Sequence, residues 1–163
     1  MSIGSHQSAK MLNDEWMTPP EIIEDLGPFD MDVCAPINRP WDTAKIHLTI
    51  DDNGLLHGWH GFVWCNPPYG KHTSDWLSRC AIYNNCLVLI FARTETRMFF
   101  DYVWNHAESI LFVEGRLYFY DVNGNKAMAN SGAPSVIIAY GNEANKRLKE
   151  STIRGKLIQL KKQ

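Results

Sequence analysis

A short apolar run that ends in two prolines constrains the fold of this 163-residue chain more than any other feature. The run Phe62-Val63-Trp64-Cys65 predicts a buried strand. Asn66-Pro67-Pro68-Tyr69 follows at once. Proline can neither donate to a β-ladder nor continue inside a helix, so the strand must end in a rigid turn. In an open α/β sheet, ligands bind at the carboxyl ends of strands, and this turn would hold an amide and an aromatic ring beside a ligand.

The other apolar patterns predict strands that alternate with helices. We expect strands at 29–33, 46–50, 62–65, 86–91, 109–113, 116–120 and 134–140, and helices at 19–26, 73–83 and 95–106. Such alternation is typical of an α/β protein with a mainly parallel sheet and helices on both faces. The turn-rich segment 121–125 separates the last two strands and favours an antiparallel excursion at the sheet edge.

The length of the chain predicts a single domain with a sizeable core. Within it we expect a loose polar segment at 1–13, the globular domain at 14–142 and a basic tail or helix at 143–163. No apolar run approaches the length of a membrane span, and no signal peptide opens the chain. These observations predict a cytoplasmic protein with no membrane partner.

The cysteines and histidines do not indicate a metal site. The chain has four cysteines: Cys34, Cys65, Cys80 and Cys86. None of them forms a C-x-x-C pair, so neither a zinc site nor a disulfide framework is predicted. The histidines near residue 57 lack acidic or thiol partners at ligand spacing. We therefore expect no metal, and the thiols fit a reducing cytoplasm.

Charge is distributed unevenly along the chain. The formal net charge is −2, but residues 144–163 carry +6 and the rest carries −8. A basic tail beside an acidic body could contact phosphates, and it could equally be a solvated terminal helix. Phosphate contacts would supply affinity and register but no sequence information.

The turn Asn66-Pro67-Pro68-Tyr69 resembles the catalytic motif of S-adenosylmethionine-dependent methyltransferases that act on amino nitrogens. That motif has Asp, Asn or Ser, then two prolines, then an aromatic residue. Other segments appear in the order typical of the bacteriophage-type DNA adenine methyltransferase family, known as phage Dam. They are Trp16-Met17-Thr18-Pro19-Pro20-Glu21, Asp32-Val33-Cys34-Ala35, Asp51-Asp52-Asn53-Gly54-Leu55, Trp59, Arg93-Thr94-Glu95-Thr96, Gly115-Arg116-Leu117-Tyr118-Phe119 and 135–140. The resemblance covers roughly residues 15 to 141.

This resemblance implies a single-domain, Rossmann-like class I methyltransferase with an antiparallel edge strand. It implies methyl transfer from S-adenosylmethionine to the N6 amine of adenine in double-stranded DNA, after the base has flipped out of the helix. The implied catalytic residues are Asn66, Pro67, Pro68 and Tyr69. The expected cofactor-binding residues are Thr18, Pro19, Asp32, Cys34, Ala35, Asp51 and Asp52. The expected DNA-binding residues are Lys71, Arg93, Lys146 and Arg147.

The sequence departs from the superfamily pattern at one turn, and several residue roles and functions have alternative interpretations. The turn after the first strand, Asp32-Val33-Cys34-Ala35-Pro36, lacks the glycines usual in the wider superfamily. Asp32 could be a strand-end cap, and Asp51-Asp52-Asn53-Gly54 a simple turn. The alternative functions are an RNA adenine or protein glutamine methyltransferase, or a non-catalytic relic that binds DNA or cofactor. A phage or prophage origin, a role against restriction and a GATC target rest on the family resemblance alone, and the oligomeric state is open.

Overall fold

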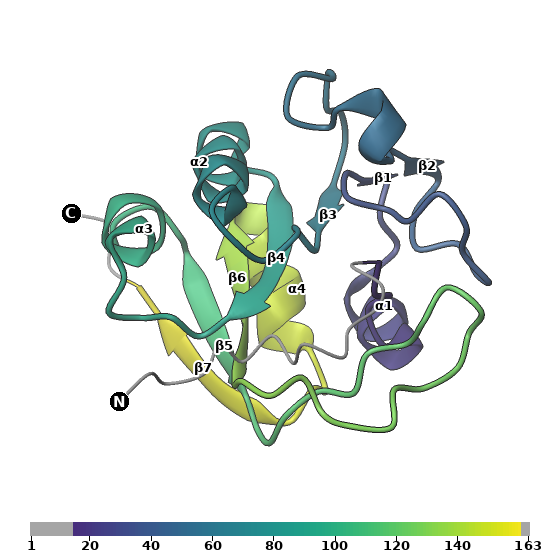
Figure 1. The fold of residues 1–163 in the computed structure, drawn as a ribbon. Coiled ribbons are helices and arrows are strands. Elements are labelled where there is room, and N and C mark those ends of the chain that lie inside the picture. Colours follow the sequence, from purple (N-terminus) through teal and green to yellow (C-terminus); the bar gives the residue numbers. More distant parts are fainter. Residues whose placement is uncertain (1–14, 161–163) are drawn as a thin grey trace.

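The structure is a computed structural model that describes residues 15–160, and it is built around one seven-stranded sheet (Figure 1). The segment expected to be loose, 1–13, lies outside the described residues. The strands are β1 (Met31–Asp32), β2 (Ile46–His47), β3 (Val63–Cys65), β4 (Cys86–Phe91), β5 (Ser109–Val113), β6 (Ser135–Tyr140) and β7 (Gly155–Gln159). The helices are α1 (Pro20–Leu26), the short 3-10 helix η1 (Ile50–Asp52), α2 (Thr73–Tyr83), α3 (Arg97–Phe99), its π-helical continuation η2 (Phe100–Trp104) and α4 (Asn142–Glu150).

The sheet has the strand order β2-β1-β3-β4-β6-β5-β7. Strands β2, β1, β3 and β4 are parallel to one another. Strand β6 is antiparallel to both β4 and β5, and β7 is antiparallel to β5 at the edge. A mixed α/β fold is therefore confirmed, with a parallel portion that runs from β2 to β4.

Two expectations about the antiparallel strands were wrong. Residues 116–120 form no strand, and only Tyr120 makes isolated bridges, to Met17 and Lys126. Strand β6 lies inside the sheet, where all six of its residues are buried. The edge strand is β7, within the segment expected to be a basic tail or helix. It was missed because most of its residues are exposed, which leaves no apolar alternation to recognise.

Helices cover both faces of the sheet, as the alternation of elements predicts. One face packs against α2 and the α3–η2 helix through Trp76, Leu77, Phe99 and Val103. The other face packs against α1 and α4 through Ile22, Leu26, Ala144 and Leu148. Strand β3 lies between these layers and is buried along its whole length, so the turn that follows it starts from a fixed position.

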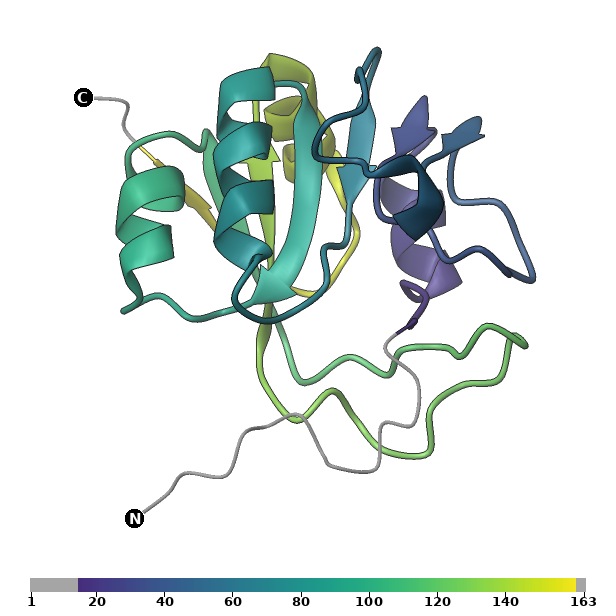
Figure 2. The same ribbon diagram turned by 45° about the horizontal axis from the view of Figure 1, so that its top comes forward.

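A long loop, 114–134, connects β5 to β6 and lies on the side to which the arrowhead of β4 points (Figure 2). The bridge between Met17 and Tyr120 joins it to the segment that precedes α1. Met128 in this loop is fully exposed, and the ammonium of Lys126 lies 5.0 Å from the centre of the Tyr118 ring. In the described part of the chain, no helix is long and apolar enough to cross a membrane.

Candidate active site

The strand order places a topological switch point between β1 and β3. From β1 the chain continues to β2 on one side, whereas from β3 it continues to β4 on the other side. Connections that leave neighbouring parallel strands in opposite directions open a crevice at their carboxyl ends, where ligands bind in open α/β sheets. Asp32 is the last residue of β1 and Asn66 directly follows β3. The two side chains singled out in the sequence therefore flank this crevice.

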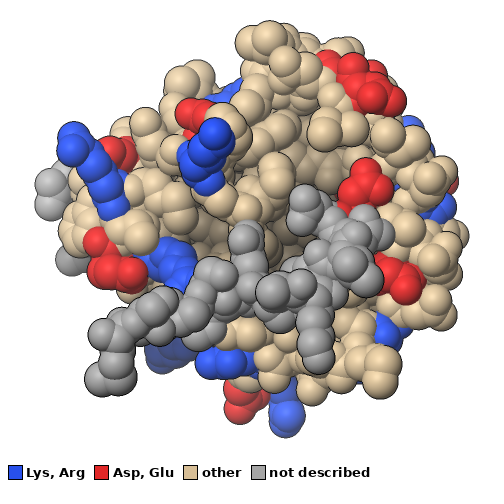
Figure 3. Space-filling model, in the orientation of Figure 1, with Lys and Arg blue, Asp and Glu red and all other residues tan. Residues whose placement is uncertain are grey.

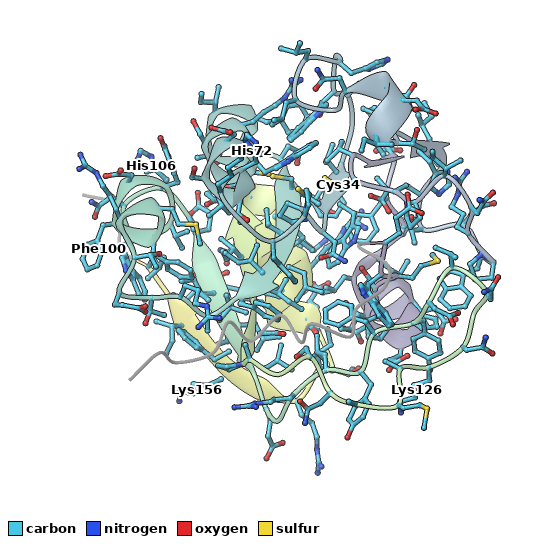
Figure 4. The ribbon with its side chains drawn as sticks, in the orientation of Figure 1. Cys34, His72, Phe100, His106, Lys126 and Lys156 are labelled. Atoms are coloured by element: carbon cyan, nitrogen blue, oxygen red, sulfur yellow. The ribbon has the colours of Figure 1, made fainter. Side chains whose placement is uncertain are left out.

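A pocket lies between these two strand ends. Its empty space is about 200 Å³, including the part open to solvent, and its lining consists of Trp16, Met17, Thr18, Asp32, Cys34, Pro36, Thr43 and Asn66. Figure 4 shows Cys34 beside β3, and His72 at the start of α2. Only about 10 Å³ of this space can hold the centre of a water-sized sphere, which is room for about one water, so a larger ligand would extend beyond the lining residues.

Asp32 is a buried carboxylate in the wall of this pocket, only 4% exposed. The Thr43 hydroxyl donates to its Oδ2 over 2.5 Å, and the backbone N–H of Cys34 donates to its Oδ1 over 3.1 Å. Burial raises the pKa of Asp32 from 3.8 to about 6, although these two hydrogen bonds and the charge of Arg39 oppose the rise. The carboxylate is thus held in one orientation and would be stabilised by a cationic ligand.

Two donors in the same pocket wall lack acceptors within the described residues. The indole Nε1 of Trp16 is buried and has no hydrogen-bond partner there. The hydroxyl of Thr18 accepts from Trp64 Nε1 and from Asn66 Nδ2, each over 3.3 Å, and donates to no other residue that the structure describes. Buried donors are normally satisfied, so the pocket is suited to a ligand that carries an acceptor.

The turn after β3 is held by hydrogen bonds to the start of α2. The Thr73 hydroxyl donates to the carbonyl of Pro68 over 2.9 Å and accepts from the N–H of Gly70 over 3.0 Å. Thr73 is buried, so α2 anchors a turn whose two prolines already limit its motion. The amide of Asn66 is therefore presented from a rigid support.

Tyr69 lies against the same amide. Its hydroxyl donates to Asn66 Oδ1 over 3.4 Å, and its ring stacks on Phe91 with ring centres 4.1 Å apart. Burial raises the pKa of Tyr69 far above its ordinary value of 10, so the phenol stays protonated. Phe91 ends β4, so two neighbouring strand ends together supply an aromatic surface beside the amide.

The structure brings together some of the residues expected to bind the cofactor and separates others. Thr18, Asp32 and Cys34 line the pocket together with Asn66. Pro19 and Ala35 adjoin lining residues in the chain but are not part of the lining. Asp51 and Asp52 lie on η1, outside the lining, where Asp52 caps the helix by accepting from the N–H of Thr49.

Sequence reasoning missed Trp16, Met17, Pro36 and Thr43 as lining residues. Trp16 and Met17 belong to the Trp-Met-Thr-Pro segment that was singled out, so their position beside Thr18 in the chain was an available signal. Thr43 offered none, because it lies in an irregular segment 11 positions beyond Asp32.

The expected DNA-binding residues fall on different parts of the fold. Lys71 is exposed and directly follows the turn at the carboxyl end of β3, and Arg93 follows β4, with its guanidinium 5.9 Å from the centre of the Phe91 ring. Lys146 is exposed on α4. On the face of the molecule that is seen in Figure 1, Lys and Arg form separate groups with Asp and Glu between them (Figure 3).

Arg147 is occupied by contacts within the protein. Its guanidinium donates to the carbonyls of Leu26 and Pro28 over 3.2 and 2.7 Å, and lies 4.2 Å from the centre of the Phe62 ring. Phe62 precedes β3, whereas Asn66 follows it, so Arg147 lies at the edge of the sheet opposite the pocket. This arrangement favours a structural role for Arg147.

We expect Arg147→Ala to destabilise the fold by roughly 1–3 kcal/mol, because it leaves two carbonyls without their charged donor. The salt dependence of DNA binding should not change, since that slope reports phosphate contacts. Urea unfolding and DNA titrations at several salt concentrations measure the two effects. A weaker salt dependence of DNA affinity with unchanged stability would instead mean that Arg147 contacts DNA phosphates.

No group of three or more His, Cys, Asp or Glu side chains is arranged to hold a metal ion within residues 15–160. The four cysteines are free thiols, three of them buried.

A family model described as DNA N-6-adenine-methyltransferase (Dam) matches residues 5–156. No match was found among curated proteins or among solved structures.

Proposed function

This chain belongs to the DNA N-6-adenine-methyltransferase (Dam) family, an enzyme family of the phage type, and we propose that it transfers a methyl group from S-adenosylmethionine to N6 of adenine in double-stranded DNA. The observation that carries the proposal is the position of Asn66. Its amide lies at the carboxyl end of β3, at the switch point, between a pocket with a buried carboxylate and an aromatic surface. The position of this amide thus supports the proposed reaction.

The pocket residues fit the methionine part of S-adenosylmethionine. The Asp32 carboxylate can accept hydrogen bonds from an ammonium. The Thr18 hydroxyl and the Trp16 indole, which lack acceptors among the described residues, can donate to a carboxylate. An amino acid carries both groups on one carbon, so a carboxylate beside neutral donors in one small pocket suits it. When bound, the cofactor supplies a methyl group on a sulfonium. The nucleoside part would extend beyond the lining, and whether Asp51 and Asp52 contact it stays a prediction.

Asn66 and the carbonyl of Pro67 would accept hydrogen bonds from the two hydrogens of the adenine amine. These bonds direct the nitrogen lone pair toward the methyl carbon. The amine nitrogen would form a bond to the methyl carbon as the bond from that carbon to sulfur breaks, which would leave the donor as a neutral thioether. The nitrogen is then cationic and acidic, and because a neutral amide cannot take its proton, the proton leaves to water. Catalysis comes from orientation and from fixed dipoles.

Tyr69 would stack on the flipped adenine. Tyr69→Ala should weaken the capture of the flipped base by roughly 1–3 kcal/mol, the usual contribution of one stacked base. Tyr69→Phe keeps the ring and is the matched control. The fluorescence of 2-aminopurine at the target position of a duplex reports flipping. Equal fluorescence changes for Tyr69→Ala and the wild-type protein would contradict stacking by Tyr69.

DNA would approach the carboxyl edge of the sheet, where Lys71, Arg93 and loop 114–134 lie. Phosphate contacts from the two basic residues would position the duplex. The loop is long for a compact domain, and loops of this length are usually functional. We propose that it carries the base readout.

Parallel assays with labelled S-adenosylmethionine test the choice of substrate. Duplex DNA, single-stranded DNA, RNA and a protein extract are offered as acceptors under the same conditions. The proposal predicts that duplex DNA takes the most label. Preferential labelling of RNA or protein would favour the alternative methyltransferases, and a protein that binds cofactor but labels nothing would be a non-catalytic relic.

A further inference from the structure

We propose that Thr18 is a positioning residue that sets which end of the Asn66 amide faces the adenine amine. The inference rests on the proposed function of the site. Asn66 must present its oxygen to the amine, because the opposite orientation would place one NH2 group against another. Asn66 cannot choose this orientation by itself, since the two ends of an amide have almost the same shape.

The hydroxyl of Thr18 accepts two hydrogen bonds in the structure, one from Trp64 Nε1 and one from Asn66 Nδ2. The indole of Trp64 is fully buried and can only donate, so it takes one lone pair of Thr18 permanently. Thr18 is itself 3% exposed, and water has little access to it. One lone pair and one hydrogen of the hydroxyl remain for Asn66 and for a ligand.

The remaining lone pair and hydrogen of the Thr18 hydroxyl permit two arrangements of its hydrogen bonds. In the first, which the structure shows, Asn66 donates to Thr18, and the hydrogen of Thr18, which has no acceptor within residues 15–160, can donate to a ligand in the pocket. In the second, Thr18 donates to the oxygen of Asn66, and the NH2 group turns toward the substrate. An acceptor bound in the pocket takes the hydrogen of Thr18 and so excludes the second arrangement. Thr18 therefore links the contents of the pocket to the orientation of the catalytic amide.

The hydrogen bond of Tyr69 is compatible with the same orientation. Its hydroxyl donates to Asn66 Oδ1, so this oxygen is on the side of the aromatic surface where the base would stack. The adenine amine would take over the position of this donor. The Tyr69 hydroxyl can accept as well as donate, so it fits either end of the amide, and the choice rests on Thr18.

The test compares Thr18→Val, which keeps the shape and removes the hydroxyl, with Thr18→Ser, which keeps the hydroxyl. We expect kcat to fall roughly 10- to 100-fold in Thr18→Val, the usual cost of a lost buried hydrogen bond, with a much smaller change in KM for DNA. Thr18→Ser should keep kcat near the wild-type value. Equal kcat in Thr18→Val and the wild-type protein would overturn the proposal, and so would equal losses in the two variants.

A binding measurement supplies a readout besides activity. Once the methylated site is mapped, two duplexes are compared that carry adenine or purine, which lacks the amine, at the target position. S-adenosylhomocysteine fills the pocket in both titrations. The cost of flipping each base is the same for every variant, so it cancels when the affinity ratios are compared. Thr18→Val should shift the ratio about tenfold toward purine, and Thr18→Ser should not shift it. An unchanged ratio in Thr18→Val would contradict the role.

A second variant covers the case in which Thr18→Val does not fold because the Trp64 indole loses its acceptor. Trp64→Phe removes that donor, so Thr18→Val/Trp64→Phe leaves no unpaired indole N–H. The double variant should regain stability and still show the shifted affinity ratio. Trp64→Phe alone should keep the affinity ratio of the wild-type protein. A wild-type protein that methylates no DNA would overturn the proposed function. A wild-type protein that methylates DNA, together with an unshifted ratio in the double variant, would overturn only the role of Thr18.

Discussion

Asn66→Ala should lower the rate of methyl transfer to DNA about 10²- to 10³-fold, the usual cost of removing one preorganised polar group from an active site. Alanine removes the acceptor that orients the adenine amine, whereas the Asp32 carboxylate and the Trp16 donor stay in place. Binding of S-adenosylmethionine should therefore change little. Single-turnover transfer and calorimetric titration with cofactor measure the two quantities separately.

Asn85→Ala is a matched control, because this asparagine precedes β4 at the other edge of the sheet and donates to the carbonyl of Gly61. It should leave the rate of transfer near the wild-type value. A rate in Asn66→Ala within a few-fold of the wild-type rate would contradict the role given to this amide. A joint loss of cofactor binding and methyl transfer would mean that Asn66 maintains the shape of the pocket and does not orient the adenine amine.

Asp32→Asn should abolish most cofactor binding and at the same time stabilise the fold. The neutral amide loses the charge that an ammonium needs, which should weaken cofactor binding by roughly 1.5–3 kcal/mol, or about 10- to 100-fold. It can still accept from the N–H of Cys34 and donate to the oxygen of Thr43. The isosteric change thus removes a buried charge and keeps the local hydrogen bonds.

The stabilisation follows from the pKa of Asp32, which burial raises from 3.8 to about 6. The folded protein holds this proton more tightly than the unfolded chain, so the wild-type protein loses stability as the pH rises from about 4 to 6. Above that window, Asp32→Asn should be more stable by on the order of 2–3 kcal/mol, and below pH 4 the advantage should disappear.

Thermal unfolding of both proteins between pH 4 and pH 8 measures this difference. Affinity for S-adenosylmethionine should also fall in the wild-type protein as the pH drops below about 6, because the carboxylate becomes protonated. Asp75→Asn, at an exposed carboxylate of α2, should show neither effect. Equal stability of Asp32→Asn and the wild-type protein at pH 8 would mean that the carboxylate is not desolvated as described.

Elements with strong local signals could be predicted from the sequence. Helix α2 and strand β4 have the predicted bounds, because each is defined by its own apolar pattern. The same reasoning failed at 116–120, where Leu117 and Phe119 pack as apolar side chains but only Tyr120 forms β-bridges. Burial was recognised there, and the absence of a partner strand was not, because pairing depends on distant residues.

The site was predicted in part, for the same reason. Asp32 ends one recognisable strand and Asn66 follows another, so the topology brings them to one crevice. The hydroxyl of Thr43 and the indole of Trp64 act through contacts between residues far apart in the chain. Arg147 shows the converse, since a basic residue that looks suited to DNA donates to the carbonyls of Leu26 and Pro28.

Nucleoside analysis of DNA after reaction with labelled S-adenosylmethionine is the most direct test of the account. The wild-type protein is incubated with unmethylated duplex DNA, and the product is digested and separated. The account predicts that the label appears in 6-methyladenine, and that the Asn66→Ala protein gives almost none. Label in another base, or no label although calorimetry shows that the cofactor binds, would contradict it.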